Sequence, residues 1–143
     1  MTRQEIEAKI KTLKKQLEKA NKKVKKLKSE MEELDDSYSA CGKVRSNVEN
    51  AIQEMLDSVK KKTETICSHK FKQYYLDRVK TIMYGKDVSD ALSLLSNASG
   101  GASRQYMDME TELTTAEGTV KKLKQEIKNL QQQLSESEDN QDE

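Results

Sequence analysis

The fold is decided by residues 6–41, which read IEAKIKTLKKQLEKANKKVKKLKSEMEELDDSYSAC. Apolar residues recur in this stretch at alternating intervals of four and three, and the only other apolar residues are Ala8 and Ala40. Two apolar positions in every seven form a narrow line along a helix, which is typical of a coiled coil. This first seam consists of Ile6, Ile10, Leu13, Leu17, Ala20, Val24, Leu27, Met31, Leu34, Tyr38 and Cys41.

A second seam with the same alternation runs over residues 106–134. Gly118 falls on its outer side, where glycine costs about 1 kcal/mol relative to alanine but obstructs no packing. The two seams predict two long helices that pack along a narrow line. The second seam consists of Tyr106, Met109, Leu113, Ala116, Val120, Leu123, Ile127, Leu130 and Leu134.

Between the seams the apolar pattern widens. Residues 44–66 keep the first register but add flanking apolar positions, and a second wide stripe occupies residues 71–83. Four of the six aromatic residues of the chain lie within residues 71–84. Asp87 is a suitable N-cap for a short helix over residues 88–95. The pattern predicts a thicker central bundle that needs more than two helices.

Folding the chain once near residue 70 brings the two seams together. The outgoing arm, about residues 4–69, and the return arm, about residues 71–135, then have nearly equal lengths. We expect helix breaks near 41–42, 85–86 and 98–103, where glycines occur, and the first and last of these would lie side by side. The sequence therefore predicts an all-α antiparallel helical hairpin, one domain over 1–135, and a disordered acidic tail over 136–143.

The composition agrees with a narrow helical core. Hydrophobic residues make up 34% of the chain and charged residues 36%, and Pro and Trp are absent. No apolar run approaches the roughly 18 residues of a membrane span, and the start of the chain lacks the apolar core of a signal peptide. We expect a cytoplasmic protein without a transmembrane segment, whose export would need a route independent of a signal peptide.

Charge is unevenly distributed, although the net charge is only +1. Residues 1–30 hold eleven Lys and Arg residues against four acidic residues. Lysine greatly outnumbers arginine, the residue that reads DNA bases by bidentate contacts. We interpret the Lys-rich arm as the solvated face of a long helix, and binding of nucleic acid or an anionic membrane is the alternative.

The residues needed for catalysis or metal binding are not grouped in this sequence. His69 is the single histidine, and Cys67 and His69 could supply only two metal ligands. Cys41 occupies a seam position, where it acts as a small apolar residue. We expect no enzymatic activity, no cofactor and no metal site.

The layout resembles a known family. Two long helices, an interrupted return arm and about 140 residues resemble the YwqH-like small helical proteins. That family is encoded beside LXG toxins and is related to the WXG helical hairpins of type VII secretion. Met83-Tyr84-Gly85 resembles the family's Trp-x-Gly turn, with Met83 in the place of Trp. Tyr106-Met-Asp-Met-Glu110 matches the export signal Tyr-x-x-x-Asp/Glu, so the resemblance implies Tyr106 and Glu110 as an export motif.

Three classes of function follow. The resemblance implies a chaperone-like or targeting partner of the helical N-terminal domain of a secreted LXG toxin, with a second small WXG-like protein as a further partner. A general coiled-coil scaffold or self-assembling homo-oligomer is the second class, and a Lys-rich nucleic-acid or membrane-surface binder is the third. For helix-against-helix binding we expect a stripe of apolar residues in the thick middle to form the site. The expected partner-binding residues are Phe71, Tyr75, Val79, Ile82 and Met83.

Overall fold

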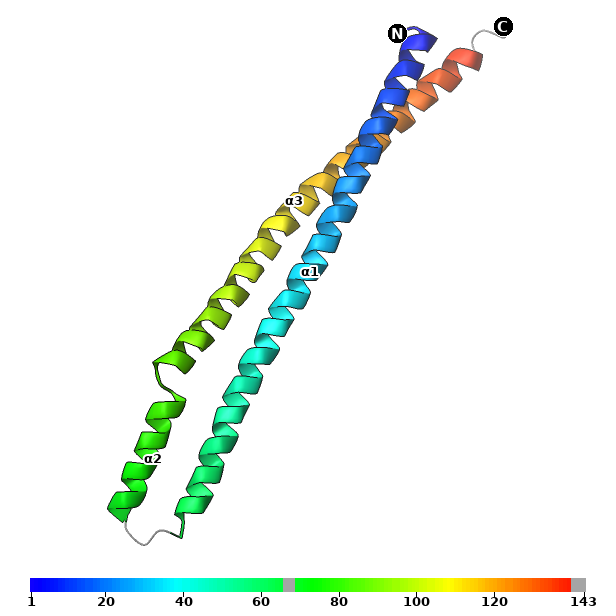
Figure 1. Cartoon of the computed structure of the whole chain (residues 1–143). Coiled ribbons are helices and arrows are strands. Elements are labelled where there is room, and N and C mark those ends of the chain that lie inside the picture. Colours follow the sequence, from blue (N-terminus) through cyan, green and yellow to red (C-terminus); the bar gives the residue numbers. More distant parts are fainter. Residues whose placement is uncertain (66–68, 140–143) are drawn as a thin grey trace. The chain divides into compact units, whose positions relative to one another are not determined.

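The chain folds into three helices in this computed structural model, which describes residues 1–65 and 69–139. Helix α1 spans Arg3–Thr63, α2 spans His69–Met83 and α3 spans Lys86–Asp139 (Figure 1). Within the described ranges there is no β-strand. The predicted all-α fold is confirmed.

Tertiary contacts group the chain into two units of similar size. Unit 1 comprises Met1–Glu33 with Tyr106–Glu143, and unit 2 comprises Leu34–Gln105. Helices α1 and α3 each contribute to both units, whereas α2 belongs to unit 2 alone. The prediction of a single domain over 1–135 stays a prediction.

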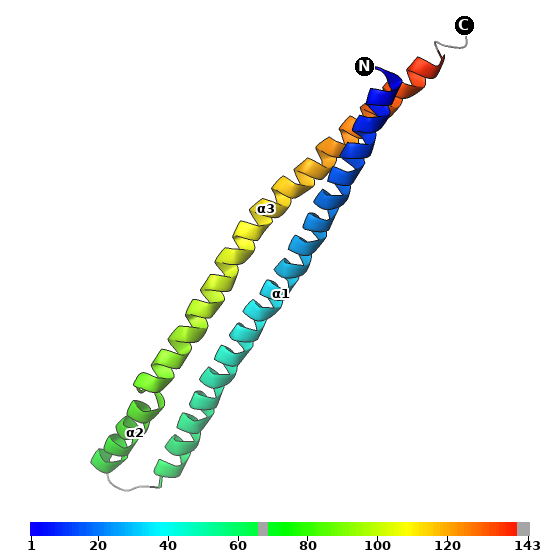
Figure 2. The same cartoon turned by 45° about the horizontal axis from the view of Figure 1, so that its top comes forward.

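Unit 1 is a two-helix coiled coil built from the two predicted seams. Its buried core contains Ile6, Ile10 and Leu13 from α1, with Ile127 and Leu130 from α3. Leu17, Leu123 and Leu134 pack against this cluster and are half-buried. The start of α1 therefore lies beside the end of α3, as Figures 1 and 2 show. Every position of the two seams within unit 1 is buried or half-buried except Tyr106.

Two ion pairs between the helices show that unit 1 is antiparallel. The Nζ of Lys9 lies 3.1 Å from Oε1 of Glu126, and the Nζ of Lys28 lies 3.1 Å from Oε1 of Glu117. Residue numbers rise along α1 while those of the partners fall along α3. About half of each side chain is exposed, so these pairs contribute little free energy and act mainly on the alignment of the helices.

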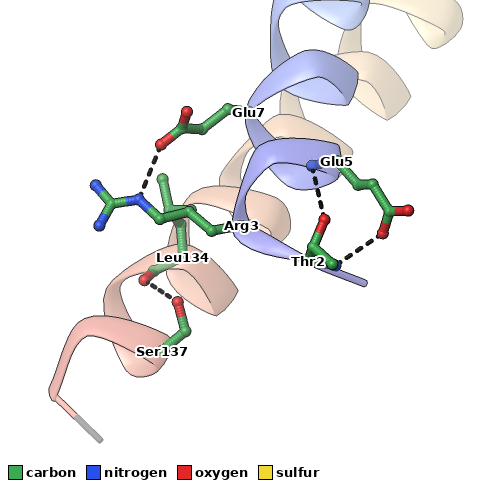
Figure 3. Close-up of polar contacts among 6 residues, drawn as sticks. All are labelled: Thr2, Arg3, Glu5, Glu7, Leu134 and Ser137. Atoms are coloured by element: carbon green, nitrogen blue, oxygen red, sulfur yellow. Dashed lines mark hydrogen bonds and ion pairs between the residues drawn. The ribbon is translucent and has the colours of Figure 1, made fainter. Parts of the chain in front are cut away.

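The start of α1 carries a capping box, which Figure 3 shows in detail. The backbone N–H of Thr2 donates to Oε2 of Glu5 at 2.7 Å, and the backbone N–H of Glu5 donates to Oγ1 of Thr2 at 3.3 Å. These bonds satisfy two of the donors that a helix N-terminus leaves without intrahelical acceptors. In the next turn, Nε of Arg3 donates to Oε1 of Glu7 at 3.0 Å. Near the end of α3, the Ser137 hydroxyl donates to the Leu134 carbonyl at 2.7 Å.

Unit 2 has a much sparser core. Its α1 segment lies beside α2 and the first part of α3 (Figures 1 and 2). A hydrogen bond of 2.8 Å from Nη1 of Arg45 to the Ser96 hydroxyl joins α1 to α3. Ile52 and Leu56 are its only buried apolar side chains among the described residues. Thr63 is also buried, and its hydroxyl donates to the Lys60 carbonyl at 2.9 Å in the last turn of α1.

Two of the three predicted helix breaks are wrong. Helix α1 passes through 41–42 and α3 passes through 98–103 without interruption. A mid-helix glycine costs only about 1 kcal/mol, and without proline every backbone N–H in these segments can continue the helical bonding. Residues 88–95 consequently belong to the start of α3 and do not form a separate short helix.

The interruption that does occur lies at Tyr84 and Gly85, within the predicted break near 85–86. The Tyr84 N–H donates to the Lys80 carbonyl at 2.9 Å, and the Gly85 carbonyl accepts the first bond of α3 from Ser89 at 3.0 Å. A Cβ on Gly85 would lie 3.0 Å from the Thr81 carbonyl oxygen. A side chain at this junction would therefore crowd the last turn of α2, and glycine avoids that contact.

The ends of the predicted arms also differ from the structure. Helix α1 ends at Thr63 instead of near residue 69. Helix α3 continues to Asp139, so residues 136–139 of the predicted disordered tail are helical. Polar residues such as Gln132 sustain these last turns, since its amide donates to Oε1 of Glu136 at 3.0 Å. Residues 140–143 of the tail, and Ile66 and Cys67, lie outside the described residues.

Candidate partner-binding surface

The two units differ sharply in how they treat their apolar side chains. Among the described residues, eight of the ten buried apolar side chains belong to unit 1 and two to unit 2. Of the twelve large apolar side chains that are exposed, nine belong to unit 2. These nine are Tyr38, Val44, Met55, Phe71, Tyr74, Tyr75, Ile82, Tyr84 and Leu94. Unit 2 therefore carries most of the exposed apolar surface that another molecule could cover.

Helix α2 carries the densest part of this surface. It has no buried residue along its 15 positions. Its exposed side chains include Phe71 at 55%, Tyr75 at 45% and Ile82 at 74%. A helix this short is marginal alone in water, so its contacts with the rest of unit 2 must hold it in place.

Those contacts come from one side of α2, which we call the inner face. It consists of Lys72, Leu76, Val79 and Met83, all half-buried. At 100° per residue these positions fall within about 60° of one another. Two of the five predicted site residues, Val79 and Met83, therefore lie on the half-buried side of α2, toward the rest of unit 2.

The adjoining side of α2 is the aromatic face. It spans about 100° of the helix, a width suited to packing against another helix. The other three predicted site residues, Phe71, Tyr75 and Ile82, all lie on it. The complete aromatic face consists of Phe71, Tyr74, Tyr75, Arg78 and Ile82, and every one of these side chains is exposed.

Two rings of the aromatic face lie against each other. Phe71 and Tyr75 stack with ring centroids 6.5 Å apart and ring planes 17° from parallel. They lie four residues apart, the spacing at which side chains on a helix meet. Stacked in this way, the two rings form one continuous apolar surface that another molecule could cover.

Sequence reasoning missed two members of this face, Tyr74 and Arg78. The positions 71, 75, 78 and 82 repeat the alternating intervals of four and three that marked the seams. A charged residue does not appear in an apolar pattern, so only the interval between positions indicates that Arg78 belongs to this face. The capping box of Thr2 and Glu5 was also missed, although the spacing Thr-x-x-Glu is its usual signal.

Positive charge surrounds α2. Residues 60–86 hold eight Lys and Arg residues against two acidic residues, Glu64 and Asp77. The last turn of α1 carries three of these bases, Lys60, Lys61 and Lys62, and their charges interact favourably with the negative end of the helix dipole. The aromatic face is thus an apolar surface within a basic environment.

The predicted export motif lies on α3 in unit 1. Tyr106 and Glu110 are both exposed and lie one helical turn apart. The Glu110 carbonyl accepts a bond from the Thr114 hydroxyl at 3.0 Å, which belongs to regular helix. The pair is accessible on the surface of a continuous helix.

The remaining candidate chemistry is sparse. Across residues 1–65 and 69–139, no group of three or more His, Cys, Asp or Glu side chains could hold a metal ion. Cys41 is a half-buried free thiol on α1, and His69 is exposed at the start of α2. None of the helices, over the residues described, has an apolar stretch long enough to cross a membrane.

Comparison with protein-family models, with curated proteins and with solved structures found no match to this chain. The exposed surface of unit 2 and the resemblance in layout and motif are therefore the observations that bear on function.

Proposed function

We propose that this chain is a non-enzymatic helical partner protein that binds another helical protein through the aromatic face of α2. The single observation that carries the proposal is the exposure of Phe71, Tyr75 and Ile82 on a helix without any buried residue. Aromatic residues and arginine dominate the free energy of protein interfaces, and the aromatic face consists of these residue types and one isoleucine.

The arrangement of unit 2 supports a helix as the ligand. The wide apolar stripes of the central sequence predicted more than two helices, and the segment expected to supply a third, residues 88–95, is part of α3. Helix α2 then has one face toward the rest of unit 2 and an adjoining face toward solvent. A helix from another protein, packed against the aromatic face, would complete a three-helix arrangement.

The family resemblance gives the partner a specific identity within this proposal. It is the helical N-terminal domain of a type VII-secreted LXG toxin, and a second small WXG-like protein completes the assembly. The chain acts as a chaperone-like targeting partner in the cytoplasm. Tyr106 and Glu110, exposed on α3, are accessible to a secretion machinery that exports proteins without a signal peptide.

Coexpression with an LXG toxin N-terminal domain from the native source tests this function. The variant Phe71→Ala with Tyr75→Ala should weaken capture of that domain by more than about tenfold. Its helicity and melting temperature should stay close to those of the wild type, because both side chains are exposed. The matched control, Tyr38→Ala with Leu94→Ala, removes two exposed apolar side chains away from α2 and should capture the domain normally.

Each other outcome gives a different answer. Unfolding of the Phe71→Ala, Tyr75→Ala variant would mean that these rings belong to the core. Full capture by a folded variant would move the interface elsewhere, first to the Lys-rich arm. A stable homodimer that the variant dissociates would favour a self-assembling scaffold, and light scattering would detect it.

A further inference from the structure

Arg78 occupies an unusual place for a charged residue, in the centre of the aromatic face. Tyr74 and Tyr75 lie one turn before it and Ile82 lies one turn after it on the same side of α2. Among the side chains that the structure describes, no carboxylate forms an ion pair with Arg78. The adjacent Asp77 lies about 100° from Arg78 around the helix axis, and its carboxylate accepts a hydrogen bond from the Gln73 amide at 3.1 Å.

A protein that covers the aromatic face must also cover the Arg78 guanidinium. Burying a charge without a partner costs several kcal/mol, so the covering surface needs an acceptor at this position. Guanidinium presents its donors as a planar fork that fits a carboxylate in bidentate fashion. The partner helix should therefore carry Asp or Glu in the middle of its apolar stripe.

The surroundings of the aromatic face favour negative charge more broadly. Lys70 on α2 is exposed and falls about 40° from Tyr74 around the helix, and Lys60, Lys61 and Lys62 end the adjacent α1. Acidic residues flanking the partner's apolar stripe would meet this field, which speeds association and rejects basic competitors. We infer that the helix bound by α2 is an acidic amphipathic helix whose central carboxylate pairs with Arg78, an inference that rests on the proposed function.

The same charges argue against two other occupants. In a two-fold pair of α2 helices, two positively charged faces would oppose each other, so a second copy of this chain is disfavoured. Amphipathic helices that lie in a membrane surface keep their charges opposite the apolar face. Arg78 instead interrupts the apolar face at its centre, which suits a protein carboxylate better than lipid chains.

A displayed library of amphipathic helices of about 20 residues, slightly longer than α2, tests the inference. Its apolar stripe is fixed as Leu and Ala, and the central stripe position and the flanking positions encode Glu, Lys or Gln in equal shares. Selection on the full-length chain should enrich Glu over Lys by about tenfold at the central position and at the flanks.

Charge-changing variants make the test specific for Arg78. Selection on Arg78→Glu should reverse the central preference to Lys, while the flanks stay acidic. Arg78→Gln removes the charge without reversing it and should abolish the preference for Glu at the central position. If Arg78→Glu is poorly folded, Arg78→Gln alone decides the test. The matched control Arg104→Glu reverses an exposed arginine on α3, about 27 Å along that helix from Lys86, and should select as the wild type does.

The remaining outcomes overturn the inference in distinguishable ways. The same library is also selected on the Phe71→Ala, Tyr75→Ala variant. If the wild type enriches helices relative to this variant but shows no preference for Glu, helix binding stands and the acidic partner is refuted. Absence of enrichment over that selection would refute helix binding by α2 as well. Binding of the chain to phosphatidylserine vesicles, with no helix enriched, would assign the aromatic face to a membrane surface.

Discussion

Replacing Gly100 and Gly101 together by alanine should stabilise the protein, because both lie inside α3 and not at a break. Alanine in a helix interior is more favourable than glycine by about 0.8–1.0 kcal/mol per site. A Cβ built on either glycine meets no heavy atom within 4 Å, so no steric cost opposes this gain. Consecutive helical residues do not face each other, so the two effects should add to about 1.6–2 kcal/mol.

The gain should appear as a rise in melting temperature of about 4–8 °C for a chain of this size. Circular dichroism during heating and urea denaturation would measure it independently. Gly85→Ala is the matched control, since its Cβ would lie 3.0 Å and 3.3 Å from the carbonyl oxygens of Thr81 and Ile82. That variant should lower the melting temperature. A loss of stability in the Gly100→Ala, Gly101→Ala variant would refute the continuous helix, because alanine is unfavourable only where the backbone departs from it.

Three further predictions concern unit 1. Leu13→Ala should cost about 2–4 kcal/mol in the free energy of unfolding, whereas Leu94→Ala in unit 2 should cost less than about 0.5 kcal/mol. The reason is that Leu13 is 7% exposed and Leu94 is 69% exposed. Equal losses of unfolding free energy, measured by urea denaturation, would contradict the burial of Leu13 in the seam. Carbodiimide should cross-link Lys28 to Glu117 within one chain, since their charged atoms lie 3.1 Å apart. Mass spectrometry of a mixture of isotope-labelled and unlabelled chains would detect intermolecular products, which would contradict this pairing. The hydrogen bond from a backbone N–H three residues earlier lowers the pKa of Glu5. Because the folded pKa is the lower one, its stabilising effect is present above the unfolded pKa and disappears as the pH falls through the folded pKa. Glu5→Gln should therefore lower the melting temperature at neutral pH and match the wild type in strong acid.

The seams were predictable because a regular interval leaves little freedom in how two helices pack. Ile10 and Leu130 are buried in one cluster, as the fold near residue 70 requires. The same regularity identified Leu17 and Leu123, which pack at the edge of that cluster. Coiled-coil packing depends on local spacing, and local spacing is what a sequence displays directly.

The helix breaks could not be predicted from glycine content alone. Gly42, Gly100 and Gly101 are helical because a propensity cost of about 1 kcal/mol each is smaller than the loss from interrupting a long helix. Gly85 lies at the interruption between α2 and α3, where a Cβ would come within 3.0 Å of the Thr81 carbonyl oxygen. That difference depends on neighbouring backbone atoms, which the identity of a residue does not reveal.

The candidate site was predictable in its location but not in its composition. The concentration of aromatic residues in 71–84 pointed to α2, and Phe71, Tyr75 and Ile82 are exposed there. The broad apolar stripe combines two adjoining faces of α2, and only the structure separates Val79 and Met83 from the exposed face. A separate helix over residues 88–95 could have covered the aromatic face. Those residues are instead the start of α3, and the sequence pattern did not indicate this.

The contrast between the units is the reason why the proposed binding would be confined to unit 2. In unit 1 each apolar line meets its counterpart, so little apolar surface is left to attract a partner. In unit 2 the aromatic face adds a second apolar line to α2, and two packed helices can cover only one line on each. Such a face would favour aggregation if it were purely apolar, but Arg78 at its centre makes burial costly without a matching carboxylate. In the proposed complex the charge would therefore select the partner, since it penalises coverage by any apolar surface that lacks an acidic group.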